Sequence, residues 1–375
     1  MISMARPDGS ASKIVRIFKN SASYLIYLAE CEGELSVCKI AHLDGAKLDR
    51  EIARIEALRE AYPGFKRRLV GVERAGKIST GEFTGKHYYL SKYVRGETFS
   101  HWIQSPTTEI GSLRNAYNTI LPVLFDLSST QRPCEGSWKT YIATMLREEL
   151  SKLESKPMLR RILSSGEIVV DGTALRSLPK LVDELLSNDV VMTIDTLGRA
   201  LSDLGHWNFH GDNVVVPDIL NPSEFKVIDP DVSIVTSDPL FGVARFLYTY
   251  SHDTADYRQY YIHTRAYVPF EAGRFEFEIR RLWPEVVARN YEDLFGRSLQ
   301  LGLPGIKGVP DELAQVRLAY CYLCCLIRGV NANFEDRLEF EGDRLDLIRN
   351  KSIFLLLAAT KFANALARNM SGSIS

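Results

Sequence analysis

Two segments hold the side chains best suited to chemistry. The first reads GHWNFHGDNVVV over residues 205–216, and the second reads FKVIDPDVS over residues 225–233. Each contains a short run typical of a strand, so we expect a hairpin that brings Asn213 and Asp229 face to face. An amide oxygen and a carboxylate suit the hard Mg²⁺ ion. The pattern predicts a site of the kind that phosphoryl transfer needs, with magnesium fixed on the phosphates and an acceptor hydroxyl held in line.

The elements before these segments predict a sheet that carries one helix. Asp44 to Glu60 has apolar residues at helical spacing, and Asp44 is a suitable N-cap. Ser21 and Ser23 flank a polar turn between two strand patterns. The strand patterns cover 14–30, which holds two strands, 35–41, 67–72 and 87–94. We therefore expect mostly antiparallel sheet in the first hundred residues.

The chain after residue 112 predicts helices interrupted by one small hairpin. Apolar stripes of helical period cover 113–130, 138–153, 193–204, 275–295, 311–328 and 345–367. A sheet-rich part followed by a helical part is an α+β arrangement, and ligands favour the cleft between such parts. We expect a flexible tail at 1–13, an N-terminal lobe at 14–95 and a helical C-terminal lobe at 96–375.

The ordered segments resemble the protein-kinase-like superfamily, in the version found in aminoglycoside phosphotransferases and choline kinases. The GHWNFHGDNVVV segment resembles the catalytic loop H-G-D-x-x-x-x-N followed by a strand. On that alignment His206 stands at the motif's histidine, Asn208 at its catalytic aspartate and Asn213 at its asparagine. The resemblance makes Asp229 the magnesium-binding aspartate and Asp231 the acidic residue that often follows two positions later.

The resemblance also implies a nucleotide site in the N-terminal lobe. Lys39 ends the strand SVCK, where the family has its phosphate-gripping lysine. Glu51 lies on the next helix, at the place of the ion-pair partner of that lysine. The turn with Ser21 and Ser23 would cover the phosphates in place of a glycine-rich loop.

Two further stretches extend the resemblance. YLSKYVRGETF resembles the inter-lobe hinge, whose backbone at Ser91, Lys92 and Tyr93 would meet the nucleotide base. SDPLFGVARF resembles the helix start D-P-x-x-D-L-A, with Gly242 where the family has its second aspartate. The resemblance implies a two-lobed kinase fold, ATP or GTP as phosphoryl donor, and Mg²⁺.

Asn208 departs from the family pattern, because an asparagine cannot take a proton from an acceptor hydroxyl. It can still orient that hydroxyl. A general base contributes a factor of about 10²–10⁴ in rate, so positioning and metal charge would leave a slow kinase. Asp212 is a candidate substitute base. Taking His210-Gly211-Asp212 as the motif itself puts Pro217, which has no ligand atom, in the place of the asparagine.

The sequence favours an ATP- or GTP-dependent phosphotransferase acting on a hydroxyl of a small molecule or of a natural-product precursor peptide. Asn208 motivates the alternative of a pseudokinase, which would bind nucleotide or peptide as the partner of another enzyme. A scaffold that binds no nucleotide is a third possibility. We expect helices after residue 250 to build the acceptor site, where Tyr260, Tyr261 and Trp283 are available aromatic residues.

Charge and hydropathy indicate which partners and which cellular compartment to expect. The formal net charge is −1, which gives no electrostatic case for binding nucleic acid or an anionic membrane. The apolar run at 353–359 is too short for a bilayer, which needs about 20 residues. The first residues lack the apolar stretch of a signal peptide, so we expect a cytoplasmic protein.

Cys321 and Cys324 have C-x-x-C spacing but lie in an apolar helical pattern, which predicts core cysteines.

Overall fold

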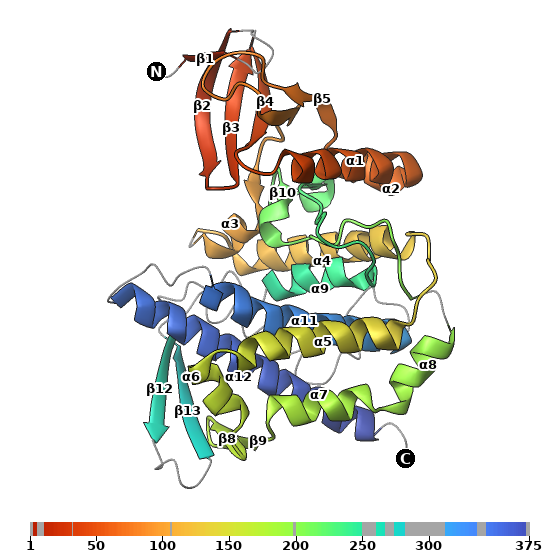
Figure 1. The fold of residues 1–375 in the computed structure, drawn as a ribbon, viewed down its shortest axis with the longest axis vertical. Coiled ribbons are helices and arrows are strands. Elements are labelled where there is room, and N and C mark those ends of the chain that lie inside the picture. Colours follow the sequence, from red (N-terminus) through yellow and green to blue (C-terminus); the bar gives the residue numbers. More distant parts are fainter. Residues whose placement is uncertain are drawn as a thin grey trace.

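The computed structural model places an N-terminal sheet next to a larger helical part. It describes residues 3–5, 11–31, 33–105, 107–197, 200–249, 260–266, 274–281, 312–335 and 343–372. Figure 1 shows the sheet and helix α1 at one end of the molecule and most of the later helices at the other end.

The N-terminal sheet has six strands in the order β1-β2-β3-β4-β6-β5. Its strands are β1 (Ser3–Ala5), β2 (Ala11–Asn20), β3 (Tyr24–Cys31), β4 (Glu34–Ala41), β5 (Val72–Lys77) and β6 (His87–Lys92). All neighbouring strands are antiparallel, as the sequence predicts. Where we expected a flexible tail over 1–13, residues 3–5 pair with residues 11–13 and extend the sheet by one strand.

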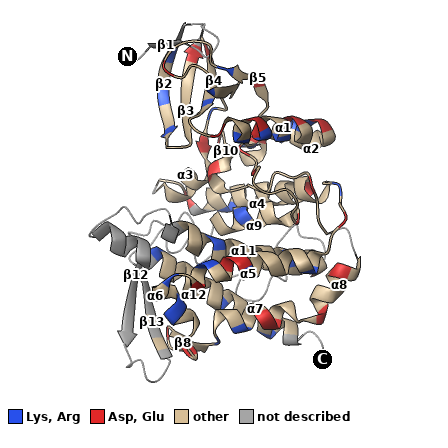
Figure 2. Ribbon diagram, in the orientation of Figure 1, with Lys and Arg blue, Asp and Glu red and all other residues tan. Residues whose placement is uncertain are grey.

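Helix α1 (Gly45–Ala61) follows β4 and matches its prediction. The Asp44 side chain caps it by accepting the N–H of Lys47 at 2.9 Å. Figure 2 shows Lys and Arg interspersed with Asp and Glu along the helix. Its buried residues recur every three or four positions and are Leu48, Glu51, Ile55 and Leu58. Glu51 is thus a charged side chain on an otherwise apolar face, and a buried charge requires a partner.

The strand expected at 67–72 is wrong. Pro63 begins a short helix, α2 (Pro63–Arg68), and proline is favoured at a first helical position. Phe65 anchors this helix in the core, and β5 starts only at Val72.

The C-terminal lobe contains most of the helices. They are α3 (Phe99–Gln104), α4 (Ile110–Ser129), α5 (Trp138–Glu154), α6 (Pro157–Leu163), α7 (Leu178–Leu186), α8 (Asp189–Leu197), α9 (Leu240–Tyr248), α11 (Glu312–Glu335) and α12 (Asp343–Gly372). A small sheet in the order β11-β10-β7 joins β7 (Glu97–Thr98), β10 (Val214–Val216) and β11 (Lys226–Val227). It contains the hairpin that the sequence predicts.

A second small sheet lies where a helix was expected. Its strands β8 (Glu167–Val170), β9 (Thr173–Leu175), β12 (Tyr260–Ala266) and β13 (Arg274–Arg281) have the order β12-β13-β8-β9. The helix expected at 275–295 is therefore wrong over 275–281, because apolar residues alternate there with the period of a strand. Residues 282–295 lie outside the described residues.

The helix expected at 193–204 ends earlier than its pattern. α8 stops at Leu197, and the chain then forms isolated β-bridges from Leu201 to Cys134 and from Ser202 to Ser237. Tertiary pairing overrides the local apolar pattern here.

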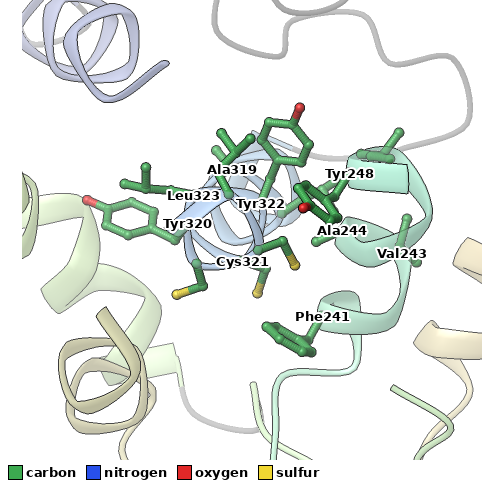
Figure 3. Close-up of a cluster of buried hydrophobic side chains, with 14 of the residues drawn as sticks. Phe241, Val243, Ala244, Tyr248, Ala319, Tyr320, Cys321, Tyr322 and Leu323 are labelled. Atoms are coloured by element: carbon green, nitrogen blue, oxygen red, sulfur yellow. The ribbon is translucent and has the colours of Figure 1, made fainter. Parts of the chain in front are cut away.

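Helix α11 lies at the centre of the C-terminal core. In Figure 3 Phe241, Ala244 and Tyr248 of α9 lie on one side of this helix, and its Tyr320 and Leu323 side chains point to the other side. Residues 312–332 are apolar and long enough to span a membrane, but 72% of the most apolar window is buried inside the structure, as in a core helix. Cys321 and Cys324 lie in this core, as expected, and burial raises the pKa of both thiols well above the usual value.

The structure confirms the predicted α+β architecture. An antiparallel sheet precedes a mainly helical lobe that contains the small β10–β11 hairpin, and the sheet carries the short helix α2 as well as the one expected helix, α1. This is the two-lobed arrangement that the kinase-like resemblance implies.

Candidate active site

One lysine ammonium joins the two lobes. Lys39 Nζ donates to both carboxylate oxygens of Glu51 at 2.8 Å and to Oδ1 of Asp229 at 2.6 Å. Lys39 lies on β4, Glu51 on α1, and Asp229 just after β11. The sequence predicted each of these three residues separately, and the structure brings them together at a single cation.

Two tyrosines complete the surroundings of this ammonium. The ring centroid of Tyr24 lies 4.7 Å from Lys39 Nζ and that of Tyr89 lies 5.9 Å away. The Tyr89 hydroxyl also donates to Glu51 at 2.7 Å. Lys39 and Tyr89 are direct cross-strand partners, so their side chains share one face of the sheet. Sequence reasoning missed both tyrosines, because this register is not visible in either strand alone.

Burial and charge compete at these groups. Burial opposes the charge of Lys39, but Asp229 and Glu51 together raise its pKa above the ordinary value. Burial, aided by the charge of Asp229, raises the pKa of Glu51 to about 7. Burial also opposes the charge of Asp229, but the adjacent Lys39 holds its pKa below the usual range. When Glu51 is ionised, one ammonium is shared by two carboxylates, and the resulting net negative charge attracts a further cation.

The catalytic hairpin links three predicted residues through hydrogen bonds. The Asn208 side-chain amide donates to the backbone oxygen of Asp229 at 2.8 Å. The Asn213 side-chain amide donates to the backbone oxygen of Asn208 at 3.2 Å. The N–H of Ile228 donates to the backbone oxygen of Asn213 at 3.0 Å. Asn213 and Asp229 are therefore held beside each other at the end of the β10–β11 hairpin, with Asn208 between them.

The donor set suits Mg²⁺, which is held by one or two protein oxygens plus waters and phosphates. Asp229 has a left-handed backbone, with φ of +57°, and its side chain is 42% exposed despite its contact with Lys39. Asn213 is half-buried. Among the residues that the structure describes, no group of three or more His, Cys, Asp or Glu could hold a metal alone. An ion here would therefore depend on Asn213, Asp229 and the phosphates of a nucleotide.

His206 supports the loop from inside the protein. It is fully buried, and its ring stacks on Phe209 with 4.6 Å between ring centroids. Burial lowers the pKa of its imidazole to about 3, so the ring is neutral at physiological pH. Its Nδ1 accepts the N–H of Asn208 at 3.3 Å. We predicted His206 as a residue of the catalytic loop; the structure places it in the core, bonded to the backbone of Asn208, and its role in catalysis stays a prediction.

Asp212 and Asp231 lie apart from the Lys39 cluster. Asp231 pairs with Arg245 at 3.2 Å and accepts the N–H of Ser233 at 3.0 Å. Asp212 is exposed and lies 3.5 Å from the ring of His210. No contact between described residues joins either carboxylate to Lys39. The roles of Asp231 in metal binding and of Asp212 as a base stay predictions.

The expected hinge follows the last central strand. Ser91 and Lys92 end β6, and Tyr93 continues from it by donating its N–H to the backbone oxygen of Leu35 at 3.3 Å. Phe18 stacks on Tyr93 with 6.4 Å between ring centroids. Contact of this segment with a nucleotide base stays a prediction.

The serine turn is held next to the lysine. The N–H of Ser21 donates to the backbone oxygen of Tyr24 at 3.0 Å, and the N–H of His42 donates to that of Ser23 at 2.9 Å. Because Tyr24 touches the Lys39 ammonium, this turn lies close to the position where phosphates would bind. Its role in covering them stays a prediction.

Replacing Lys39 by methionine should lower the free energy of unfolding, because the buried Glu51 carboxylate then has no cationic partner. Breaking one side of a buried ion pair costs about 3–5 kcal/mol. Glu51 has a pKa raised from 4.5 to about 7 in the folded state, and removing Lys39 raises it further. A folded-state pKa above the unfolded value gives stability that is present below the unfolded pKa and lost as pH rises. We therefore expect Lys39→Met to lose less free energy of unfolding at pH 5 than at pH 8, measured by urea unfolding.

The matched control for this prediction is the double variant Lys39→Met/Glu51→Gln, which removes both charges. It should recover much of the stability and lose most of the pH dependence. An equal loss of unfolding free energy for Lys39→Met at both pH values would show that Glu51 does not carry an uncompensated charge in that variant.

No family model matches the chain, and no curated protein matches it. Among solved structures it is similar to a thermostable mutant of aminoglycoside phosphotransferase APH(4)-Ia in ternary complex with AMP-PNP and hygromycin B. The identity is 14%, the TM-score is 0.49, and the match covers 97% of this chain and 96% of that one. It is also similar to spectinomycin phosphotransferase APH(9)-Ia in complex with ADP and spectinomycin, with 10% identity, a TM-score of 0.43 and 93% coverage of each chain.

Proposed function

We propose that the protein is a magnesium-dependent phosphotransferase that takes a phosphoryl group from ATP or GTP. The acceptor is a hydroxyl of a small molecule or of a natural-product precursor peptide. The observation that supports this most strongly is the Lys39 ammonium held between Glu51 of one lobe and Asp229 of the other. A buried lysine in this position binds an anionic phosphate tail when the opposing carboxylate is neutralised by a metal ion.

The chain's own groups would divide the work in a defined way. Glu51, itself held by Tyr89, orients Lys39 toward the phosphates. Asn213 and Asp229 hold Mg²⁺, which neutralises charge on the phosphates when bound. The β6 end at Ser91, Lys92 and Tyr93 meets the base, and the turn at Ser21 and Ser23 covers the phosphates.

Asn208 would orient the acceptor rather than deprotonate it. Its side-chain nitrogen is used in the bond to Asp229. Its Oδ1 is buried and has no hydrogen-bond partner among the described residues. A buried acceptor without a partner is costly, so a hydroxyl that donates to this oxygen would be stabilised there. Without a general base the transfer loses a factor of about 10²–10⁴ in rate.

A pseudokinase is the second candidate function. The Asn208 side chain bonds to the backbone of Asp229, and Lys39 is already neutralised by two carboxylates. A protein of this kind would bind nucleotide or peptide as the partner of another enzyme, without turnover. The expectation that helices carry Tyr260 and Tyr261 is wrong, because both residues begin the strand β12. Trp283 lies outside the described residues, so the acceptor site stays a prediction.

Nucleotide binding should raise the melting temperature only with an intact Asp229. A ligand at about 100 times its Kd stabilises by about 2.7 kcal/mol. We expect MgATP or MgGTP to shift the wild type, and Asp229→Asn to lose most of this shift, in thermal denaturation.

Asp171→Asn is a closely matched control for that substitution. Asp171 also has a positive φ, of 50° against 57° for Asp229, and its side chain is also 42% exposed. It also pairs with a lysine, Lys361, at 2.7 Å, but in the C-terminal lobe. The control should keep the full shift. An unshifted wild type, or a full shift in Asp229→Asn, would contradict the proposed site.

Replacing Asn208 by aspartate distinguishes the slow kinase from the pseudokinase. A carboxylate at this position supplies a base, so phosphorylation of an acceptor should rise by about 10²-fold or more. The measurement is transfer of radiolabelled phosphate from ATP or GTP to a panel of alcohols and serine- or threonine-containing peptides. The control is Asn188→Asp, on the α7–α8 connection. No labelling by either protein, with nucleotide binding intact, would favour the pseudokinase.

A further inference from the structure

Helix α1 sends a second side chain toward the C-terminal lobe. Arg54 lies three residues after Glu51, and residues at this spacing lie on the same side of a helix. One Arg54 nitrogen donates to the backbone oxygen of Gly205 at 3.2 Å, and another donates to that of Ile234 at 3.1 Å. Its guanidinium carbon lies 4.7 Å from the ring centroid of Trp207. A single side chain of the N-terminal lobe thus contacts the start of the 205–216 segment at Gly205 and the residue that follows the 225–233 segment, Ile234.

The loop that Arg54 contacts is under constraint. Trp207 is fully buried and has a left-handed backbone, with φ of +50°. Such a conformation costs about 1–3 kcal/mol in a residue other than glycine and persists only where the surroundings enforce it. Gly205 and Trp207 lie on either side of His206, and Trp207 directly precedes Asn208. The direction of the Asn208 side chain therefore depends on how these two neighbours are held.

From the α9 side the loop is held at its far end, where the N–H of Gly211 donates to the Thr249 hydroxyl at the end of α9 at 3.1 Å, while Gly242 offers only packing beside Trp207. Gly242 stands where the kinase-like pattern has an aspartate. A Cβ at this position would lie 2.9 Å from the Phe209 ring and 3.3 Å from the Trp207 Cα, so there is no room for a polar side chain. Arg54 supplies charged donors to the same loop from the opposite lobe.

We propose that Arg54 is a positioning residue that couples helix α1 to the catalytic loop. Glu51 and Arg54 make α1 a shared support, so a shift of the helix would loosen the grip of Lys39 and the placement of Asn208 together. This coupling rests on the proposed phosphotransferase function for its consequence in catalysis, but the contacts themselves can be tested without turnover.

The test compares Arg54→Met with Arg54→Lys and with the control Arg50→Met. Arg50 lies on the same helix with its side chain 60% exposed, and it forms a 4.0 Å surface ion pair with Asp44. The first readout is hydrogen exchange of peptides covering 205–213 and 45–61. Arg54→Met should speed exchange in 205–213 by about tenfold or more while 45–61 stays protected. Arg54→Lys should restore part of this protection, since one donor still reaches a carbonyl.

The second readout separates phosphoryl transfer from nucleotide binding. Arg54→Met should lower kcat by about 10- to 100-fold, the size expected for a misplaced catalytic loop, with less than a threefold change in the nucleotide KM. Absence of turnover in the wild type would count against the proposed function, and hydrogen exchange would still decide the coupling.

Three outcomes would overturn the coupling. One is unchanged exchange in 205–213 for Arg54→Met, and another is an equal change for Arg50→Met. The third is uniformly faster exchange across the whole protein, which would make Arg54 a general stability residue.

Discussion

The charge balance at Lys39 is the constraint on which the site depends. A buried ammonium is tolerated only with partners, and here the partners come from both lobes. Glu51 is fixed by the apolar face of α1 and by the hydroxyl of Tyr89. Asp229 is fixed by the hairpin and by the side chain of Asn208. The position of each lobe therefore sets the surroundings of the same cation.

This balance also explains why the arrangement suits a ligand that is both anionic and metal-bound. Two carboxylates face one ammonium, and the pKa of Glu51 is raised to about 7 mainly by burial. A divalent ion at Asp229 would relieve the excess negative charge and free Lys39 for phosphate oxygens. The side chain of Asp229 is partly exposed, whereas Lys39 and Glu51 are buried, so the exchange would occur on the Asp229 side.

The resemblance of short segments to the kinase-like family was enough to predict the three charged groups that meet at Lys39. Lys39 lies near the end of a strand, Glu51 lies on a helix with clear spacing, and Asp229 follows a hairpin, so each residue falls in a recognisable segment. Tyr24 and Tyr89 could not be predicted, because their contact with Lys39 depends on how three strands align.

Long-range contacts explain the other features that the sequence did not predict correctly. Arg54 has the pattern of a surface charge on a helix, and only the packing of two lobes gives it carbonyl partners at Gly205 and Ile234. β13 was misjudged because alternating apolar residues beside a longer apolar run also fit a helix, and its pairing with β8 is set by residues a hundred positions earlier. The end of α8 was set in the same way, by bridges to distant segments.

The most direct test is a crystal structure with Mg²⁺ and a non-hydrolysable ATP analogue. The account predicts that Lys39 Nζ leaves Asp229 for a phosphate oxygen while keeping Glu51, and that the Asn213 amide oxygen and the Asp229 carboxylate contact one ion. A nucleotide bound elsewhere, or a Lys39–Asp229 pair unchanged beside a bound nucleotide, would contradict it.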